Sequence, residues 1–546
     1  MKTRARLAVV AAILFCSASA CSVGPDYHRP KLDLAASFAE PPVAAREAAD
    51  EAAWWESFGD PALARLVRRA VVAAPRMREA LARVREAREL RAADVGAFFP
   101  QIKGKADYNN SRISENGFFK SIPAPASTLF NSLDIFETSF DAQWEIDVFG
   151  HVRRTVEAAG DELAAAEAGA EDVRRSLAAE TAREIVEIRS YDERLRIAES
   201  NIGSQGETLD ILRERRHAGV ASEAEVARAD AQLASTQSEI PALRARRAGS
   251  LHRLEALVAA PSGTLDAELA PAHGIPQPAE LPRAGLPSDL LLHRPDVARA
   301  ESELAAATAR IGIARSELLP RFSLTGSFGV QSQTIGDLLT SDSRLWYVGP
   351  GMQWPIFSAG RLRAAARAAT ARAEQSAARY EIVVRDAIAD VESSLAALRE
   401  ERTRESLLAR EADDEALAAD ATRDEYRSGL TDLLHVLDAE RERYRAEDAL
   451  AASRQTLAEQ AIALYKAVGG PWTPTASANA AADANGAGGA DSAQNAAARA
   501  EDAGARADDA SAESTASATA GQPAASRVIT ASAISSPRSV SATVAP

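Results

Sequence analysis

The sequence predicts a mainly α-helical protein with a few membrane-type β-strands. Three observations support this fold class. Long alanine-rich stretches without proline favour helices over much of the chain. Four segments alternate apolar and polar residues with a period of two, as a strand with two different faces does. The same elements recur in the same order in both halves of the chain, which indicates an internal duplication.

The N-terminus has the layout of a secretory signal peptide. Basic residues precede the apolar run LAVVAAILF, and SASAC follows it. This last stretch is similar to a bacterial lipobox, in which Cys21 becomes the acylated first residue, although Ala18 stands where leucine is usual. Ordinary cleavage after Ala20 is the alternative. We expect a signal peptide over 1–20 and a lipidated N-terminal segment over 21–61.

Matched positions in the two halves define the duplication. Pro75 and Pro295 lie 220 residues apart, and each precedes a helical stretch that ends 25 residues later at a second proline. Trp144 and Trp354 lie 210 residues apart. A difference of ten residues in the loop between the paired strands reconciles the two offsets.

The elements follow from this duplication. The first repeat is expected over 62–261, with helices over 62–97, 151–218 and 222–259 and strands over 101–109 and 136–148. A linker over 262–286 leads to the second repeat over 287–471, with helices over 288–318, 361–428 and 431–468 and strands over 321–331 and 345–357. The tail over 475–546 contains no leucine, methionine or aromatic residue and is expected to be disordered.

The strand FETSFDAQWEIDVFG, residues 136–150, places aromatic residues on one face and four carboxylates on the other. Strands of about 9 to 11 residues cross a bilayer when tilted. Four strands do not close a barrel, and an open edge in lipid leaves backbone groups unpaired. Either the sheet is soluble, with one face packed on helices, or several chains each contribute four strands to one barrel.

The helices are of two lengths. The proline-free stretch from 150 to 219 spans roughly 100 Å at 1.5 Å per residue. A heptad series runs along it, made of Ile188, Leu195, Ile202 and Leu209. The helices on the far side of each turn are about half as long, so that two of them stacked end to end match one long helix. The result is a rod of helices that continues the sheet.

Several function classes are excluded. The net charge of −15 argues against nucleic acid as a partner, because nucleic-acid binding requires a basic face. The seven histidines are scattered, and the sequence has no H-x-x-x-H pair, no phosphate loop and no G-x-S-x-G motif. We therefore expect neither an enzyme nor a cofactor or metal site.

One stretch carries a specific family resemblance. GLPSDLLLHRPDVARAESELAAATARIGIARSELLPRFSLTGSFG, residues 285–329, resembles the signature stretch of the TolC-like outer membrane efflux proteins, in the lipoprotein branch that serves resistance-nodulation-division pumps. CSVGPDYHRP, HAGVASEAEVARADAQL and YRSGLTDLLHVLDAERERY are also similar to that family. The resemblance covers about residues 21–472 and does not include the tail.

The resemblance implies a homotrimer with a 12-stranded β-barrel in the outer membrane, continued by a 12-helix tunnel across the periplasm. The polar strand faces would line a water-filled exit, and the apolar faces would meet outer-membrane lipid. A periplasmic adaptor (membrane fusion) protein and an inner-membrane resistance-nodulation-division pump would be the partners. Lipid-anchored in the outer membrane, the duct would passively conduct drugs or other small toxic compounds. The alternatives are metal-ion efflux, type I protein secretion or, in a different class, a periplasmic coiled-coil adaptor or scaffold.

The resemblance also implies a periplasmic gate. The family closes its tunnel with rings of apolar and acidic side chains, which Leu434 and Asp438 match, and Arg441 matches a linked basic position. His435 stands where some relatives carry a second aspartate. Without the resemblance, these residues fit a leucine in a helix seam and an ordinary Asp–Arg pair three residues apart. The two expected adaptor-contacting hairpin tips are Gly219, Val220, Ala221 and Ser222, and Gly429, Leu430, Thr431 and Asp432.

The composition of the tail generates a first prediction. A chain truncated before Thr475 is expected to assemble and to support drug resistance like the full-length protein, because the tail offers no apolar face with which to dock. Native gel electrophoresis of outer-membrane extracts and antibiotic susceptibility of complemented cells measure the two properties. Loss of the trimer on truncation contradicts this expectation.

Overall fold

The structure is a computed structural model that describes residues 22–40, 51–112, 133–270, 274–279, 287 and 294–469. The expected signal peptide, Cys21 and the tail over 475–546 lie outside the described residues. Among those described, no helix combines the length and apolar character that a membrane-spanning helix requires.

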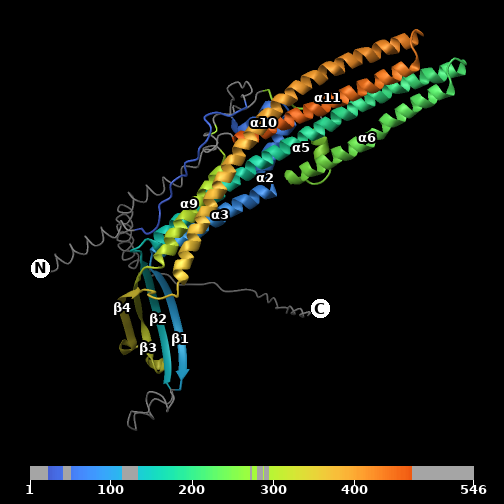
Figure 1. Cartoon of the computed structure of the whole chain (residues 1–546). Coiled ribbons are helices and arrows are strands. Elements are labelled where there is room, and N and C mark those ends of the chain that lie inside the picture. The colour runs from blue at the N-terminus through green and yellow to red at the C-terminus, as the bar shows by residue number, and fades with distance from the viewer. Residues whose placement is uncertain are drawn as a thin grey trace, which may run out of the picture. The chain divides into compact units, whose positions relative to one another are not determined.

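Each half of the described chain contains two strands and a hairpin of long helices (Figure 1). The first half contains η1 (Glu51–Phe58), α2 (Pro61–Ala73), α3 (Pro75–Val95), η2 (Gly96–Phe98), β1 (Gln101–Ser111), β2 (Leu133–Ile146), α5 (His151–His217), α6 (Glu223–Leu257) and α7 (Leu265–Leu269). The second contains α9 (Pro295–Ser316), β3 (Arg321–Ser332), η4 (Ile335–Asp337), η5 (Ser341–Ser343), β4 (Arg344–Gln353), α10 (Arg361–Arg427) and α11 (Leu433–Val468).

The prediction of one helix over 62–97 is wrong, because α2 and α3 are separate. The break is at Ala74, whose φ of −56° and ψ of 138° are not helical. Pro75 follows, and a proline both lacks the N–H that would continue the helix and disfavours helical geometry in the residue before it. The same effect places the start of α9 at Pro295, because Arg294 is extended. Residues 288–293 of the helix predicted over 288–318 lie outside the described residues.

Two predicted strands end earlier in the structure. The strand predicted over 345–357 stops at Gln353, and Pro355 follows, which offers no backbone N–H for a ladder. The strand predicted over 136–148 stops at Ile146. Asp147 instead accepts a hydrogen bond of 2.9 Å from the backbone N–H of Arg153, in the first turn of α5. The last carboxylate of the alternating segment therefore satisfies a backbone N–H in the first turn of a helix.

The four strands form one antiparallel sheet in the order β1-β2-β3-β4. Its register joins the alternating residues of all four strands into one apolar face: Gly104 pairs with Phe140, Phe140 with Phe328, and Phe328 with Trp346. Phe140 is 64% exposed and Trp346 is 73% exposed. No α-helix of the described chain makes more than isolated contacts with the sheet. The described chain therefore does not show the helix-packed sheet face that the soluble alternative requires.

The opposite face of the sheet is polar, but it is not uniformly acidic. Lys105 of β1 lies beside the carboxylates, with its Nζ 2.8 Å from Asp107 Oδ2 and 3.7 Å from Glu137 Oε1. Lys103 pairs in register with Asp141. The basic residues of β1 thus offset part of the negative charge that the sequence of β2 places on this face.

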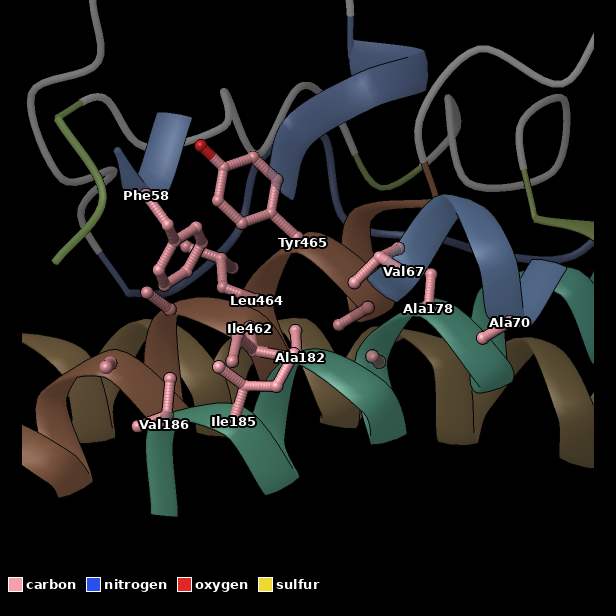
Figure 2. Packing of buried hydrophobic residues seen from close by; sticks show 14 of the residues in the cluster. Phe58, Val67, Ala70, Ala178, Ala182, Ile185, Val186, Ile462, Leu464 and Tyr465 are labelled. Carbon is pink, nitrogen blue, oxygen red and sulfur yellow. The ribbon is translucent and has the colours of Figure 1, made fainter. Parts of the chain in front are cut away.

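The long helices pack in hairpins, α5 with α6 and α10 with α11, while α9 lies against both α5 and α10. The largest buried cluster lies where α2, α5 and α11 meet, and Figure 2 shows Val67, Ile185 and Ile462 from these three helices. Trp54 stacks on Tyr465 at the edge of this cluster, with 5.0 Å between the ring centroids. Small alanine side chains along the contacts let the helix axes approach closely.

The backbone repeats the duplication that the sequence predicts. Gly219 and Gly429, which lie 210 residues apart, have φ values of 75° and 76°. Such positive values favour glycine, which has no Cβ. At the sheet-to-helix junctions, the indole N–H of Trp144 donates to the carbonyl of Phe98 at 2.9 Å, and that of Trp354 donates to the carbonyl of Leu318 at 3.1 Å. Equivalent residues therefore form the same turn and the same sheet-to-helix hydrogen bond in each repeat.

Residues 22–40 run alongside helices that come much later in the chain. The Tyr27 hydroxyl and Arg29 Nε both donate to Glu301 Oε1 of α9, at 3.1 Å and 2.7 Å. Burial and the neighbouring Glu301 carboxylate raise the pKa of Tyr27, which keeps its hydroxyl protonated as a donor. Farther along, two successive backbone N–H groups donate to Glu392 of α10 at 2.7 Å and 2.9 Å. This N-terminal segment is thus tied to both helices.

Two arginines hold helix ends in the middle of the molecule. Arg189 of α5 is buried, and its Nε lies 3.0 Å from Asp60 Oδ2, while its Nη1 donates to the carbonyl of Leu269 at the end of α7 at 2.7 Å. Asp60 also caps α2 by accepting from two backbone N–H groups. Arg294 donates to the carbonyl of Ala467 in the last turn of α11 at 3.0 Å. Both arginines thus satisfy carbonyls that the helices leave open.

Substitution of Asp60 by alanine is expected to destabilise the protein strongly. Asp60→Ala leaves the guanidinium of Arg189 buried without its carboxylate, a loss of about 3–5 kcal/mol for a buried pair. The control is Glu56→Ala, which removes an exposed pair with Arg68 at 2.9 Å and costs roughly 0–1 kcal/mol. Thermal unfolding in detergent measures both variants, and equal melting temperatures would show that the buried pair contributes little.

Candidate functional site at the hairpin tips

The two hairpin turns have the same backbone geometry. The N–H of Val220 donates to the carbonyl of Arg215 at 2.9 Å, and that of Leu430 donates to the carbonyl of Glu425 at 2.9 Å. These bonds, together with the left-handed glycine before each donor, are those of a Schellman helix end. The turn places Val220 and Leu430 in an exposed position at each tip. The structure therefore makes turns of both predicted tips, each with an apolar side chain facing outward.

Side-chain caps start the return helices. Ser222 Oγ accepts from the backbone N–H of Glu225 at 3.3 Å, and the Glu225 carboxylate accepts from the backbone N–H of Ser222 at 2.6 Å. This reciprocal pair is a capping box. Asp432 caps α11 by accepting from the backbone N–H groups of Leu434 and His435 at 2.9 Å and 3.3 Å. Hydrogen bonds from the His435 backbone and ring lower the pKa of Asp432, so the cap stays ionised at neutral pH.

The predicted gate residues share an exposed face of α11. Leu434 is 50% exposed, which is unusual for a leucine in a helix seam. Asp438 follows one turn later, and Arg441 Nη2 lies 2.9 Å from Asp438 Oδ1. Arg441 Nε also lies 3.3 Å from Glu442 Oε1. The structure thus brings Leu434, Asp438 and Arg441 together as a leucine beside a solvated ion pair.

The opposite face of α11 is packed. Leu433 and Val436 are buried against Leu209 and Leu212 of α5. Because three- and four-residue steps return to the same helix face, Leu434 and Asp438 point away from this cluster. Leu434 and Asp438 therefore lie on an exposed face of α11, which we call the gate face.

A cross-hairpin contact at the tips was not predicted from the sequence. The guanidinium of Arg215 lies over the ring of Tyr426, 4.2 Å from its centroid, and Arg215 Nη2 donates to the carbonyl of Tyr426 at 3.0 Å. This contact joins α5 to α10, so the two hairpins hold each other at their ends. Its only sequence signal is that each residue falls in the last turn of its long helix.

Comparison with known proteins identifies the family. The sequence profile described as "Outer membrane efflux protein" matches residues 66–260 and 286–470. The chain is 32% identical over 469 residues to nodulation protein T of Rhizobium leguminosarum bv. viciae, with 85% of this chain and 93% of the relative covered. It is 30% identical over 438 residues to the pyoverdine export outer membrane protein OpmQ of Pseudomonas putida, with 80% and 92% covered.

Solved structures agree with the sequence comparison. The outer-membrane channel OprN superposes with a TM-score of 0.76 at 33% identity, and the match covers 83% of this chain and 100% of that chain. The predicted TolC-like fold is confirmed, and the family is one of channels and not of enzymes. The chain therefore belongs to the outer membrane efflux protein family and is an outer-membrane efflux duct.

Proposed function

We propose that three copies of the chain form the complete duct, with twelve strands in the outer membrane and twelve helices in the periplasm. The observation that carries this proposal is the exposed apolar face that runs in register through β1 to β4. In lipid such a face is stable, but the edges at β1 and β4 are not, because their backbone groups need partners. Neighbouring copies supply those partners when β1 of one chain pairs with β4 of the next.

A lipid anchor at Cys21 fits the course of the chain that follows it. The backbone N–H of Val23 donates to the carbonyl of Phe149 at 3.1 Å, just after β2 ends. Ser22 lies so close to Gly150 that a Cβ on the glycine would be 2.6 Å from Ser22 Oγ. The N-terminal segment therefore begins where the apolar sheet face ends. An acyl chain on Cys21 would enter the membrane at that level.

At the periplasmic end of this duct, we assign closure to the gate face and adaptor binding to the hairpin tips. Three copies of Leu434 and Asp438 around the axis would close the tunnel, with Arg441 compensating part of the acidic charge. Such exposed pairs contribute roughly 0–1 kcal/mol each, so a docked protein can open the ring. The tips at Gly219–Ser222 and Gly429–Asp432 would meet a periplasmic adaptor, which couples the duct to an inner-membrane resistance-nodulation-division pump.

The cargo that we propose is drugs or other small toxic compounds. The names of the relatives point to different cargoes: one is a nodulation protein, and another is named for pyoverdine export. The family therefore defines the duct and leaves the cargo open. Metal-ion efflux and type I protein secretion are the competing cargo assignments, and the genes beside the one for this chain would distinguish them. A periplasmic adaptor or scaffold is not favoured, because the family profile matches both repeats.

Opening of the proposed gate is measurable in planar bilayers. Leu434→Ala combined with Asp438→Ala is expected to raise the single-channel current and to sensitise cells to large antibiotics, because both ring-forming side chains are removed. The matched control is Leu417→Ala combined with Asp424→Ala, which removes an exposed leucine and an aspartate paired with Arg427 three residues on. Unchanged conductance of a correctly assembled gate variant would falsify the gate assignment.

Acylation of Cys21 is tested by mass spectrometry of the mature N-terminus, which should show a lipid-modified cysteine. An unmodified N-terminus would rule the anchor out. Cys21→Ala is expected to reduce membrane attachment during assembly but to leave finished trimers in the outer membrane, because the apolar sheet face then holds them. Trimers of the Cys21→Ala variant in the soluble fraction would show that the sheet does not insert.

A further inference from the structure

A polar layer separates two apolar clusters behind the gate face. The cluster nearest the tips includes Leu209 and Val436, and the next one along the helices includes Ile197 and Tyr444. Between them lie four polar residues contributed by α5, α10 and α11. They are Gln205, Thr208, Arg423 and Glu440, which we call the polar layer.

Glu440 is the centre of the polar layer. It is 1% exposed, although its sequence neighbours Arg441 and Glu442 are solvated. Thr208 Oγ1 donates to Glu440 Oε1 at 3.0 Å, and Arg423 Nη2 donates to the same oxygen at 3.3 Å. The second oxygen, Oε2, is buried and has no hydrogen-bond partner among the described residues. A buried carboxylate oxygen in this state is costly unless something hydrogen-bonds to it.

Gln205 and Arg423 bring further unmet hydrogen-bonding groups. Gln205 is 2% exposed, and neither its Oε1 nor its Nε2 has a partner in the described chain. It precedes Thr208 by three residues on α5, so the two side chains lie on the same helix face, about 5–6 Å apart at their Cβ atoms. Arg423 Nε is also buried, and it too lacks a partner among the residues that the structure describes. Two acceptors and two donors are thus left in one buried layer.

The chemistry of these groups selects a neutral ligand. A cation is disfavoured because the guanidinium of Arg423 already lies against Glu440, and an anion is disfavoured by the Glu440 carboxylate. The ligand must both donate, to Glu440 Oε2 and Gln205 Oε1, and accept, from Gln205 Nε2 and Arg423 Nε. Water does both, and buried water in proteins typically makes about three such bonds.

We propose that the polar layer is a binding site for ordered water, enclosed within each protomer between α5, α10 and α11. The proposal does not depend on the trimer or on the gate assignment, because all four residues belong to one chain and the atoms left without partners are buried within it. It has a consequence for α11, the helix that carries Leu434 and Asp438. A hydrated contact exchanges hydrogen bonds as helices shift, whereas a close-packed apolar contact has to be broken.

A map of the assembled full-length protein, by electron cryomicroscopy at a resolution that shows ordered water, tests the site directly. We expect density within hydrogen-bonding distance of Glu440 Oε2 and of the Gln205 amide. An amide of Gln205 that donates directly to Glu440, with no density between them, would overturn the proposal.

A pair of variants gives an independent test. Gln205→Leu is expected to lower the melting temperature in detergent, because the leucine displaces the water and leaves Glu440 Oε2 without a donor. The matched control is Gln237→Leu, at an exposed glutamine of α6, which should melt like the unaltered protein. If the layer is dry, Gln205→Leu removes two unsatisfied atoms and raises the melting temperature. A rise, or no change relative to the control, therefore refutes the water site.

Discussion

The need to pair every backbone group at the two sheet edges is the constraint on which the rest of this structure depends. The apolar face of the sheet suits lipid, yet among the described strands β1 and β4 each present an unpaired ladder. Copies of the chain that close the sheet must also bring their helices around the same axis. In the trimer that we propose, the helix hairpins form a wall around a passage, and Leu434 and Asp438, which face away from the packed side of α11, would be available to that passage.

Buried arginines lie at the helix ends within this wall of helices. The helices are alanine-rich and pack closely, but several end in mid-structure, where carbonyls need donors. Arg189 and Arg294 supply them, and each is also held by carboxylates. A guanidinium has five N–H donors in a fixed plane, so one side chain can bind a helix end and an acidic partner together. The junctions between stacked short helices thus depend on directed hydrogen bonds as much as on apolar burial.

Periodic features of the fold could be predicted from the sequence. Features that depend on a single local contact could not. Alternation located all four strands, and matched glycines and tryptophans located the turns and junctions of both repeats. It did not locate the break at Ala74, because the apolar pattern of α2 continues past it. The burial of Glu440 was not predicted, because a run of alternating Glu and Arg is typical of a solvated helix face. Only the structure shows that α5 and α10 cover this residue. The Leu434 face was predicted through the family resemblance, and the structure adds its exposure and its ion pair.

The N-terminal segment has a consequence for the order of biogenesis. Residues 22–40 leave the ribosome well before α9 and α10, and the partners of Tyr27 and Ala39 lie 274 and 353 residues later in the chain. Contacts across such separations form late, because a long loop must close before they are made. The segment therefore stays undocked until α9 and α10 have folded. During that interval the N-terminal segment of a newly exported chain has none of its contacts with Glu301 and Glu392, and its docking reports that α9 and α10 are in place.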